Sequence, residues 1–169
     1  HGLEVFQPSS LKDLAEVKRL ASLRPDIIIV VAFGQILPQA ILGIPEFGCL
    51  NVHPSLLPRY RGPSPIASAI LAGDEETGVT VMLMDAGMDT GPILAQKRVP
   101  VEDKDTTKSL GENLARAGAA LLMEVLPQWL ERRLTPKPQR EEEATYTRPI
   151  SKSDGEIDWE LSAMELGRR

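Results

Sequence analysis

The apolar run DIIIVVAF at positions 26–33 constrains the fold of this chain more than any other segment. Its residues are mostly β-branched or aliphatic, and they lack the polar alternation of a strand with one face in water. Pro25 and Gly34 bound the run. Strands of this kind occur in parallel sheets that are covered on both faces. We therefore predict a central strand over residues 26–33.

The segments on either side of this run predict alternating helices and strands. LKDLAEVKRLASL (11–23) has helical spacing, and Ser9 or Ser10 is expected to cap it. A short helix over 38–42 and a strand in GCLNVH follow, and a helix in SPIASAILAG is expected to end at Gly73. The pattern predicts an α/β fold with a Rossmann-like, mostly parallel sheet.

The character of the sheet is expected to change after this helix. GVTVMLMD (78–85) and GPILAQKRVPV (91–101) alternate in part, which is typical of an antiparallel addition. A long helix is expected from Asp105 to about Arg133, with Pro127 kinking or restarting it. Residues 134–149 are rich in proline and charge and predict an exposed linker. Residues 150–169 look like the first strand and helix of a further domain, and the chain starts as though cut from a longer protein.

Composition excludes several classes of protein. The 169 residues are 42% hydrophobic, which is enough for one core of ordinary size, and the formal net charge of −5 offers no general attraction to polyanions or anionic membranes. Cys49 is the sole cysteine, so no intrachain disulfide can form. No apolar run is long enough to span a membrane, and no metal cluster is expected. A cytoplasmic setting follows as the expectation.

The stretch NVHPSLLPRYRG (51–62) is the strongest sign of chemistry. Asn51 and His53 are two positions apart, so on a strand their side chains point to the same face. An amide donor beside an imidazole suits acyl transfer, because the amide can donate to a developing oxyanion while the imidazole donates or shuttles a proton. The plainer alternative is a buried histidine at a strand end. Arg59 and Arg61 are either part of the site or solvated turn residues.

A charged partner for His53 is expected in MDAGMDTG (84–91), where Asp85 and Asp89 flank a glycine loop. A purely structural loop stays possible, because Asp and Gly are common turn residues. A calcium loop is disfavoured, since Gln96 stands where its twelfth residue would be a carboxylate. DTG also occurs in aspartic proteases, but these need two such carboxylates, and this chain has one copy. Ser55 lacks the G-x-S-x-G context of a serine hydrolase.

Taken together, these motifs resemble the formyltransferase family that uses 10-formyltetrahydrofolate. The Asn and His of NVHPSLLPRYRG, with the Asp of MDTG 36 residues after the histidine, match the pattern that the family shares. RYRGPSPIASAILAGDEETGVTVMLMDAGMDTGPIL and the later ATYTRPISKSDGEIDW are similar to the methionyl-tRNA branch. The resemblance implies a formyltransferase fold that is incomplete at the N-terminus. It implies a partial catalytic domain over 1–133, a linker over 134–149 and the stub of a C-terminal tRNA-binding domain over 150–169.

The resemblance also implies roles for individual residues. The catalytic set is Asn51, His53 and Asp89, with Asp89 favouring the protonated ring of His53. The folate-binding residues are Ser55, Leu56, Leu57 and Pro58 in one turn, Gln35, Ile36 and Leu37 in another segment, and Asp85. The implied reaction transfers the formyl group of 10-formyltetrahydrofolate directly to the amine of initiator methionyl-tRNA, without a metal.

Two alternatives stay open at this point. A sugar or nucleotide formyltransferase would share the three catalytic residues and use another amine, and a non-catalytic fragment would bind folate alone. The full-length enzyme is expected to be a monomer without membrane attachment. The chain by itself is expected to self-associate through an exposed sheet edge.

Overall fold

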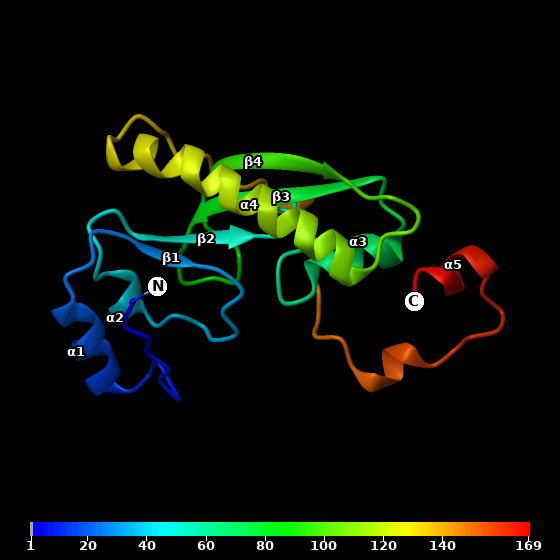
Figure 1. Cartoon of the computed structure of the whole chain (residues 1–169), viewed down its shortest axis with the longest axis horizontal. Helices are drawn as coiled ribbons and strands as arrows, with labels where there is room; N and C mark the ends of the chain where they lie inside the picture. Colours follow the sequence, from blue (N-terminus) through cyan, green and yellow to red (C-terminus); the bar gives the residue numbers. More distant parts are fainter. Residues whose placement is uncertain (1) are drawn as a thin grey trace.

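One mixed sheet of four strands, in the order β1-β2-β3-β4, organises the computed structural model, which describes residues 2–169 (Figure 1). The strands are β1 (Ile28–Val30), β2 (Cys49–His53), β3 (Glu76–Leu83) and β4 (Ile93–Pro100). β1 pairs with β2 in parallel, and the other two pairs are antiparallel. The predicted α/β class and its antiparallel addition are confirmed. The parallel part is smaller than expected, since one of the described strand pairs is parallel.

Helices cover the sheet in two places. The long α4 (Thr107–Leu130) crosses β2, β3 and β4, whereas α1 (Leu14–Ser22) and α2 (Gln39–Leu42) lie beside the β1 end (Figure 1). α3 (Pro65–Ala72) packs beside α4 and ends at Gly73 in the left-handed conformation, as predicted. Residues after α4 form the 3₁₀ turns η1 (Glu141–Glu143) and η2 (Lys152–Gly155) and the short α5 (Ala163–Gly167).

Alternation along β2 divides the core between the two sides of the sheet. Leu50 packs with Leu121 and Val125 of α4, on one side. Its neighbour Cys49 packs with Val30 of β1 and Ile41 of α2, on the other side. Because side chains alternate along a strand, Asn51 and His53 share the side of Cys49 and face away from α4.

The expectation for residues 26–33 was wrong in extent and place. Only Ile28–Val30 form a strand, and it lies at the edge of the sheet. Among the described residues, only β2 pairs with it, so nothing covers the segment that follows: Val31 is 58% exposed and Phe33 44% exposed. An apolar run can predict a strand, but not which neighbours the strand will have.

Smaller differences concern the ends of elements. The cap of α1 is Asp13, whose carboxylate accepts the N–H of Ala15, and not Ser9 or Ser10. α4 runs past Pro127 to Leu130 without restarting. In residues 150–169 the predicted strand is absent, and η2 and α5 occur instead. None of the helices within residues 2–169 is both long and apolar enough to cross a bilayer.

Candidate active site

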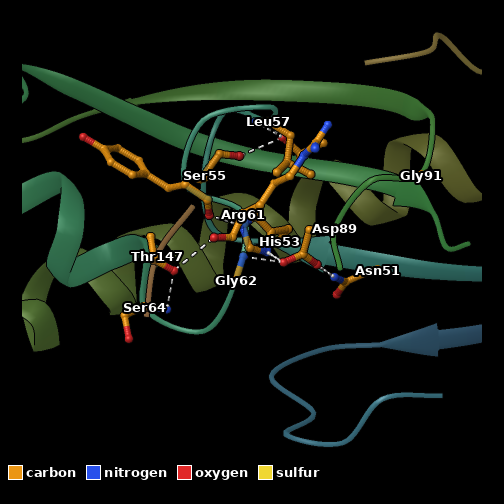
Figure 2. A network of polar contacts seen from close by, with 12 residues as sticks. Asn51, His53, Ser55, Leu57, Arg61, Gly62, Ser64, Asp89, Gly91 and Thr147 are labelled. Atoms are coloured by element: carbon orange, nitrogen blue, oxygen red, sulfur yellow. Dashed lines mark hydrogen bonds and ion pairs between the residues drawn. The ribbon is translucent and has the colours of Figure 1, made fainter. Parts of the chain in front are cut away.

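Asn51, His53 and Asp89 meet on the side of the sheet that faces away from α4 (Figure 2). Asn51 and His53 come from β2, and Asp89 comes from the loop between β3 and β4. The His53 side chain is 5% exposed and that of Asp89 is 15% exposed, so the group is largely withdrawn from water. The predicted catalytic set is therefore assembled in space.

The Asp89 carboxylate is shared among three partners. Its Oδ1 accepts a hydrogen bond from Asn51 Nδ2 at 3.3 Å, and its Oδ2 accepts one from the backbone N–H of Gly62 at 2.7 Å. The same Oδ2 lies 3.7 Å from His53 Nδ1. Since a carboxylate can only accept, the Asn51 amide must present its NH₂ group to it, which fixes the orientation of that amide. One hydrogen of the NH₂ group is left for another acceptor.

The ring of His53 is fixed by a backbone carbonyl. Nε2 lies 2.9 Å from Tyr60 O, and because a carbonyl oxygen can only accept, the proton of this bond belongs to Nε2. The nitrogen that faces Asp89 is therefore Nδ1. At 3.7 Å this pair is too long for a hydrogen bond, and the carboxylate lies beside the ring nitrogen that Tyr60 does not bind. The site thus holds an amide donor and an imidazole whose Nδ1 faces a carboxylate.

The turn after β2 is held by a second polar group, centred on Thr80 of β3. Thr80 Oγ1 donates to Ser55 O at 2.7 Å and accepts from the N–H of Leu57 at 3.1 Å. Gln96 Nε2 of β4 donates both to Thr80 Oγ1 and to Leu57 O. Ser55 Oγ closes the turn by donating to Arg59 O at 2.6 Å. The turn is consequently rigid, and the Leu57–Pro58 peptide bond within it is cis.

The predicted folate-binding residues occupy different environments. Ser55 and Leu57 are buried, whereas Leu56 and Pro58 are partly exposed. Leu37 is buried beside Ile41, Ile36 is 82% exposed, and the Gln35 side chain accepts from the N–H of Leu11. Asp85 accepts hydrogen bonds from Thr90 Oγ1 and the N–H of Gly87, so it orders its own loop. Within residues 2–169, no hydrogen bond joins Gln35, Ile36, Leu37 or Asp85 to the catalytic set.

Two further residues lie beside the site, and the sequence assigns neither of them to it. Arg61, for which the sequence allows either a role in the site or a solvated turn, is fully buried. Gln139, from the expected linker, donates to the carbonyl oxygens of Asp89 and Gly91 at 2.8 and 2.7 Å. Burial by itself would lower the pKa of Arg61, but its hydrogen bonds to Glu141 and Tyr146 and the charge of Glu141 outweigh this effect and raise it. Because 50 residues separate Gln139 from Asp89, no local sequence pattern could have indicated the contact.

The geometry can be compared with known proteins. Residues 2–126 match the family described as formyl transferase. This chain belongs to that family. The match includes all three residues of the catalytic set.

Several formyl transferases are similar to this member of the family over nearly its whole length. It is 50% identical to the methionyl-tRNA formyltransferase of Methylococcus capsulatus over 169 residues, which is 100% of this chain and 55% of the relative. It is also 50% identical to that of Chloroflexus aggregans over 168 residues, with 99% of this chain and 54% of the relative covered. The chain thus spans about half the length of the curated relatives it matches.

Solved structures of other proteins share the fold. PseJ from Anoxybacillus kamchatkensis, in complex with a UDP-sugar and tetrahydrofolate, is 29% identical with a TM-score of 0.66, and the match covers 72% of this chain and 64% of that one. HypX from Aquifex aeolicus, in complex with tetrahydrofolic acid, is 22% identical with a TM-score of 0.78 over 90% of this chain and 26% of that one, a likeness that shows the fold alone. Among residues 2–169 there is no cluster of three or more side chains suited to bind a metal.

Proposed function

We propose that this chain carries the catalytic site of a methionyl-tRNA formyltransferase, which moves the formyl group of 10-formyltetrahydrofolate to the amine of initiator methionyl-tRNA. The observation that carries the proposal is the 50% identity to methionyl-tRNA formyltransferases over all 169 residues. The identity continues past residue 126, where the general family match ends, and through the later segments. The spatial grouping of Asn51, His53 and Asp89 supports the same chemistry.

The proposed reaction is a direct transfer. The neutral amine attacks the formyl carbon, the electrons of the C=O bond move to oxygen, and the tetrahedral species collapses with loss of the folate N10. The amine gives up one proton and N10 takes up one, so the protons balance. The second N–H of Asn51 would stabilise the oxyanion, which is worth roughly 10²- to 10³-fold in rate for a preorganised donor. His53 Nδ1, beside Asp89, would hold a proton close to the same oxygen.

For the folate, we propose a site between the turn Ser55–Pro58, the segment 35–37 and the loop of Asp85. Three observations support it: the rigid turn directly follows His53, Ile36 is exposed beside buried Leu37, and a 29% identical relative binds tetrahydrofolate. Folate is a substrate in this scheme, and no metal takes part in the proposed step.

For the whole protein, we propose three parts. Residues 1–133 are part of the catalytic domain, residues 134–149 are the linker, and residues 150–169 begin a C-terminal domain that binds tRNA. The full-length enzyme would work in the cytoplasm as a monomer. The division into parts is supported by the coverage of the relatives, of which this chain matches about half.

A second candidate is the formylation of a nucleotide-linked amino sugar. It is favoured by the likeness to PseJ, whose solved complex contains a formamido sugar nucleotide. The lower identity, 29% against 50%, makes it the weaker candidate.

The test is a substrate panel with the full-length protein and 10-formyltetrahydrofolate. Charged initiator methionyl-tRNA and nucleotide-linked amino sugars are supplied separately, and the formylated products are measured by mass spectrometry. We expect formylmethionyl-tRNA alone. Formylation of a sugar without formylation of the tRNA would select the second candidate, and no transfer to any amine would reject both.

A further inference from the structure

The residues after α4 form a strap over the catalytic loops, instead of a free tether. We use the name strap for residues 137–147. The N–H of Arg61 donates to Thr145 O at 2.9 Å, and the N–H of Thr147 donates to Arg61 O at 2.7 Å. The strap is thus joined by main-chain bonds to the turn of residues 59–62, which we name the arginine turn. At its other end, Lys137 exchanges two main-chain hydrogen bonds of 2.8 Å with Ile93 of β4. The strap is therefore anchored at one end to β4, directly after the loop that carries Asp89, and at the other end to the turn that carries Arg61.

Gln139 is the point of the strap that reaches this loop. Its Oε1 accepts from Arg61 Nε at 3.1 Å and from Arg61 Nη2 at 3.0 Å. Its Nε2 donates to Asp89 O at 2.8 Å and to Gly91 O at 2.7 Å. The amide of Gln139 thus uses both of its hydrogens and both lone pairs, and the guanidinium of Arg61 fixes which end points to the loop.

Arg61 is well suited to orient Gln139, because it is fully buried and each of its three guanidinium nitrogens donates a hydrogen bond to the strap. Its Nη1 donates to Tyr146 Oη at 2.7 Å and to Glu141 Oε1 at 2.9 Å, and both partners belong to the strap. A buried charge needs such partners, since its removal from water is costly.

Asp89 needs support from its surroundings. Its φ of +57° lies in the left-handed region, which costs a residue with a Cβ atom on the order of 1–2 kcal/mol and persists when neighbouring groups hold the backbone in place. The two hydrogen bonds from Gln139 hold the carbonyls on both sides of Thr90. With the backbone held in this way, the carboxylate reaches Asn51, Gly62 and His53 together.

We propose that Gln139, oriented by Arg61, is a positioning residue for Asp89, and that the strap is thereby part of the active site. The inference rests on the proposed function for its kinetic consequences. Gln139 touches neither of the proposed substrates' reacting atoms; it acts through the backbone of Asp89.

The substitution Gln139→Glu separates this role from simple stabilisation. A glutamate keeps an oxygen for Arg61 and adds a favourable charge, but it has no hydrogens for Asp89 O and Gly91 O. If Gln139 only satisfies Arg61, Gln139→Glu will retain full activity. If it positions Asp89, kcat will fall by about 10- to 100-fold while the melting temperature and the Kd for tetrahydrofolate stay close to those of the wild type.

The experiment compares Gln139→Glu and Gln139→Ala with Gln128→Ala in the full-length protein. Gln128 is a matched control, because it donates to Glu124 O within α4, remote from the site. The ring NMR signals of His53 supply a readout that requires no turnover. We expect both Gln139 variants to shift these signals and to lower kcat, and Gln128→Ala to change neither.

The results test the positioning role of Gln139 separately from the proposed function. Wild-type kcat and unshifted His53 signals in Gln139→Glu would overturn the positioning role. Shifted His53 signals in a protein that formylates no methionyl-tRNA would retain the positioning role and reject the proposed function.

Discussion

Asp89 links all other members of the catalytic set. It is the residue that both Asn51 and His53 contact, and it binds the backbone of the arginine turn through Gly62. A neutral side chain at this position would lose the charge beside His53 and one acceptor. The left-handed φ of Asp89 directs its side chain toward Asn51, His53 and Gly62. The unusual backbone conformation is therefore what allows one carboxylate to contact all three.

Cys49 lies two positions before Asn51 on the same side of β2. We expect both the reactivity of its thiol and its contribution to stability to depend on pH. Burial raises the pKa of its thiol from 9.0 to about 11. The thiolate is the reactive form, so we expect slow alkylation by iodoacetamide at pH 8 in the folded protein and rapid alkylation after unfolding in urea. Because the folded pKa is the higher one, the stabilising contribution is present below pH 9 and declines as the pH rises toward 11.

The Cys49→Ala variant is the reference for the stability measurement. The difference in urea midpoint between wild type and this variant should shrink between pH 9 and pH 11, because only the wild type carries the thiol. Equal alkylation rates for folded and unfolded protein at pH 8 would contradict the burial of Cys49.

The sequence could predict that Asn51, His53 and Asp89 meet in space. Asn51 and His53 are two positions apart on one strand, and Asp89 stands in the glycine loop between the next two strands. Gln139 could not be predicted, because its partners Arg61 and Asp89 lie 78 and 50 residues away. The role of Gln139 depends on how the strap packs against the loop of Asp89. The sequence of the strap indicates only that the segment is polar.

At the scale of elements, a glycine in α4 allows this helix to pack closely against the sheet. Gly118 lies in the middle of this helix, where glycine is normally unfavourable, and a Cβ atom there would stand 2.9 Å from Val52 Cγ1 and 3.2 Å from Val79 Cγ1. The glycine allows the helix to approach β2 directly behind Asn51 and His53. α4 therefore supports the strand that carries the site.

This contact predicts opposite effects of alanine at two glycines of α4. Gly118→Ala should lower the free energy of unfolding by about 1–2 kcal/mol, since the clash with Val52 and Val79 outweighs the gain in helix propensity. Gly111→Ala should raise it by about 0.5–1 kcal/mol, because the nearest atom to its Cβ would be Ile66 Cδ1 at 3.7 Å. Urea midpoints of the two variants test this, and a stabilised Gly118→Ala variant would show that the helix stands farther from β2.

The prediction of the elements succeeded where the periodicity was strong and both ends were marked. α3 ends at Gly73 and the two antiparallel strands occur where their patterns indicate. It failed for residues 26–33, since burial on both faces requires neighbours that a sequence pattern does not specify. For residues 134–149 the expected exposure agrees with the structure, since none of these residues is buried, but the sequence did not indicate the main-chain hydrogen bonds that anchor the strap.

Within residues 2–169, the sheet has an open edge at β1. β1 pairs only with β2 among the described residues, and Val31, Phe33 and Ile36 are exposed near that edge. Apolar edges of this kind favour association between copies. We expect the polypeptide of residues 1–169, prepared by itself, to self-associate in sedimentation experiments and to bind a hydrophobic dye.

The control for this behaviour is Val31→Lys, since a lysine at a strand edge opposes pairing with another copy. This variant should sediment as a smaller species and bind less dye. A monomeric wild-type polypeptide without dye binding would show that these residues cover their own edge.

The proposed chemistry depends most directly on Asn51, whose remaining N–H is the oxyanion donor. The decisive measurement is the single-turnover rate of formyl transfer to methionyl-tRNA by Asn51→Ala in the full-length enzyme, with the Kd for tetrahydrofolate measured separately. We expect the rate to fall by about 10²-fold or more while the Kd stays within about threefold, because the donor acts on the transition state and not on bound folate. A wild-type rate in Asn51→Ala would contradict the assignment of this group of residues as the formyl transfer site.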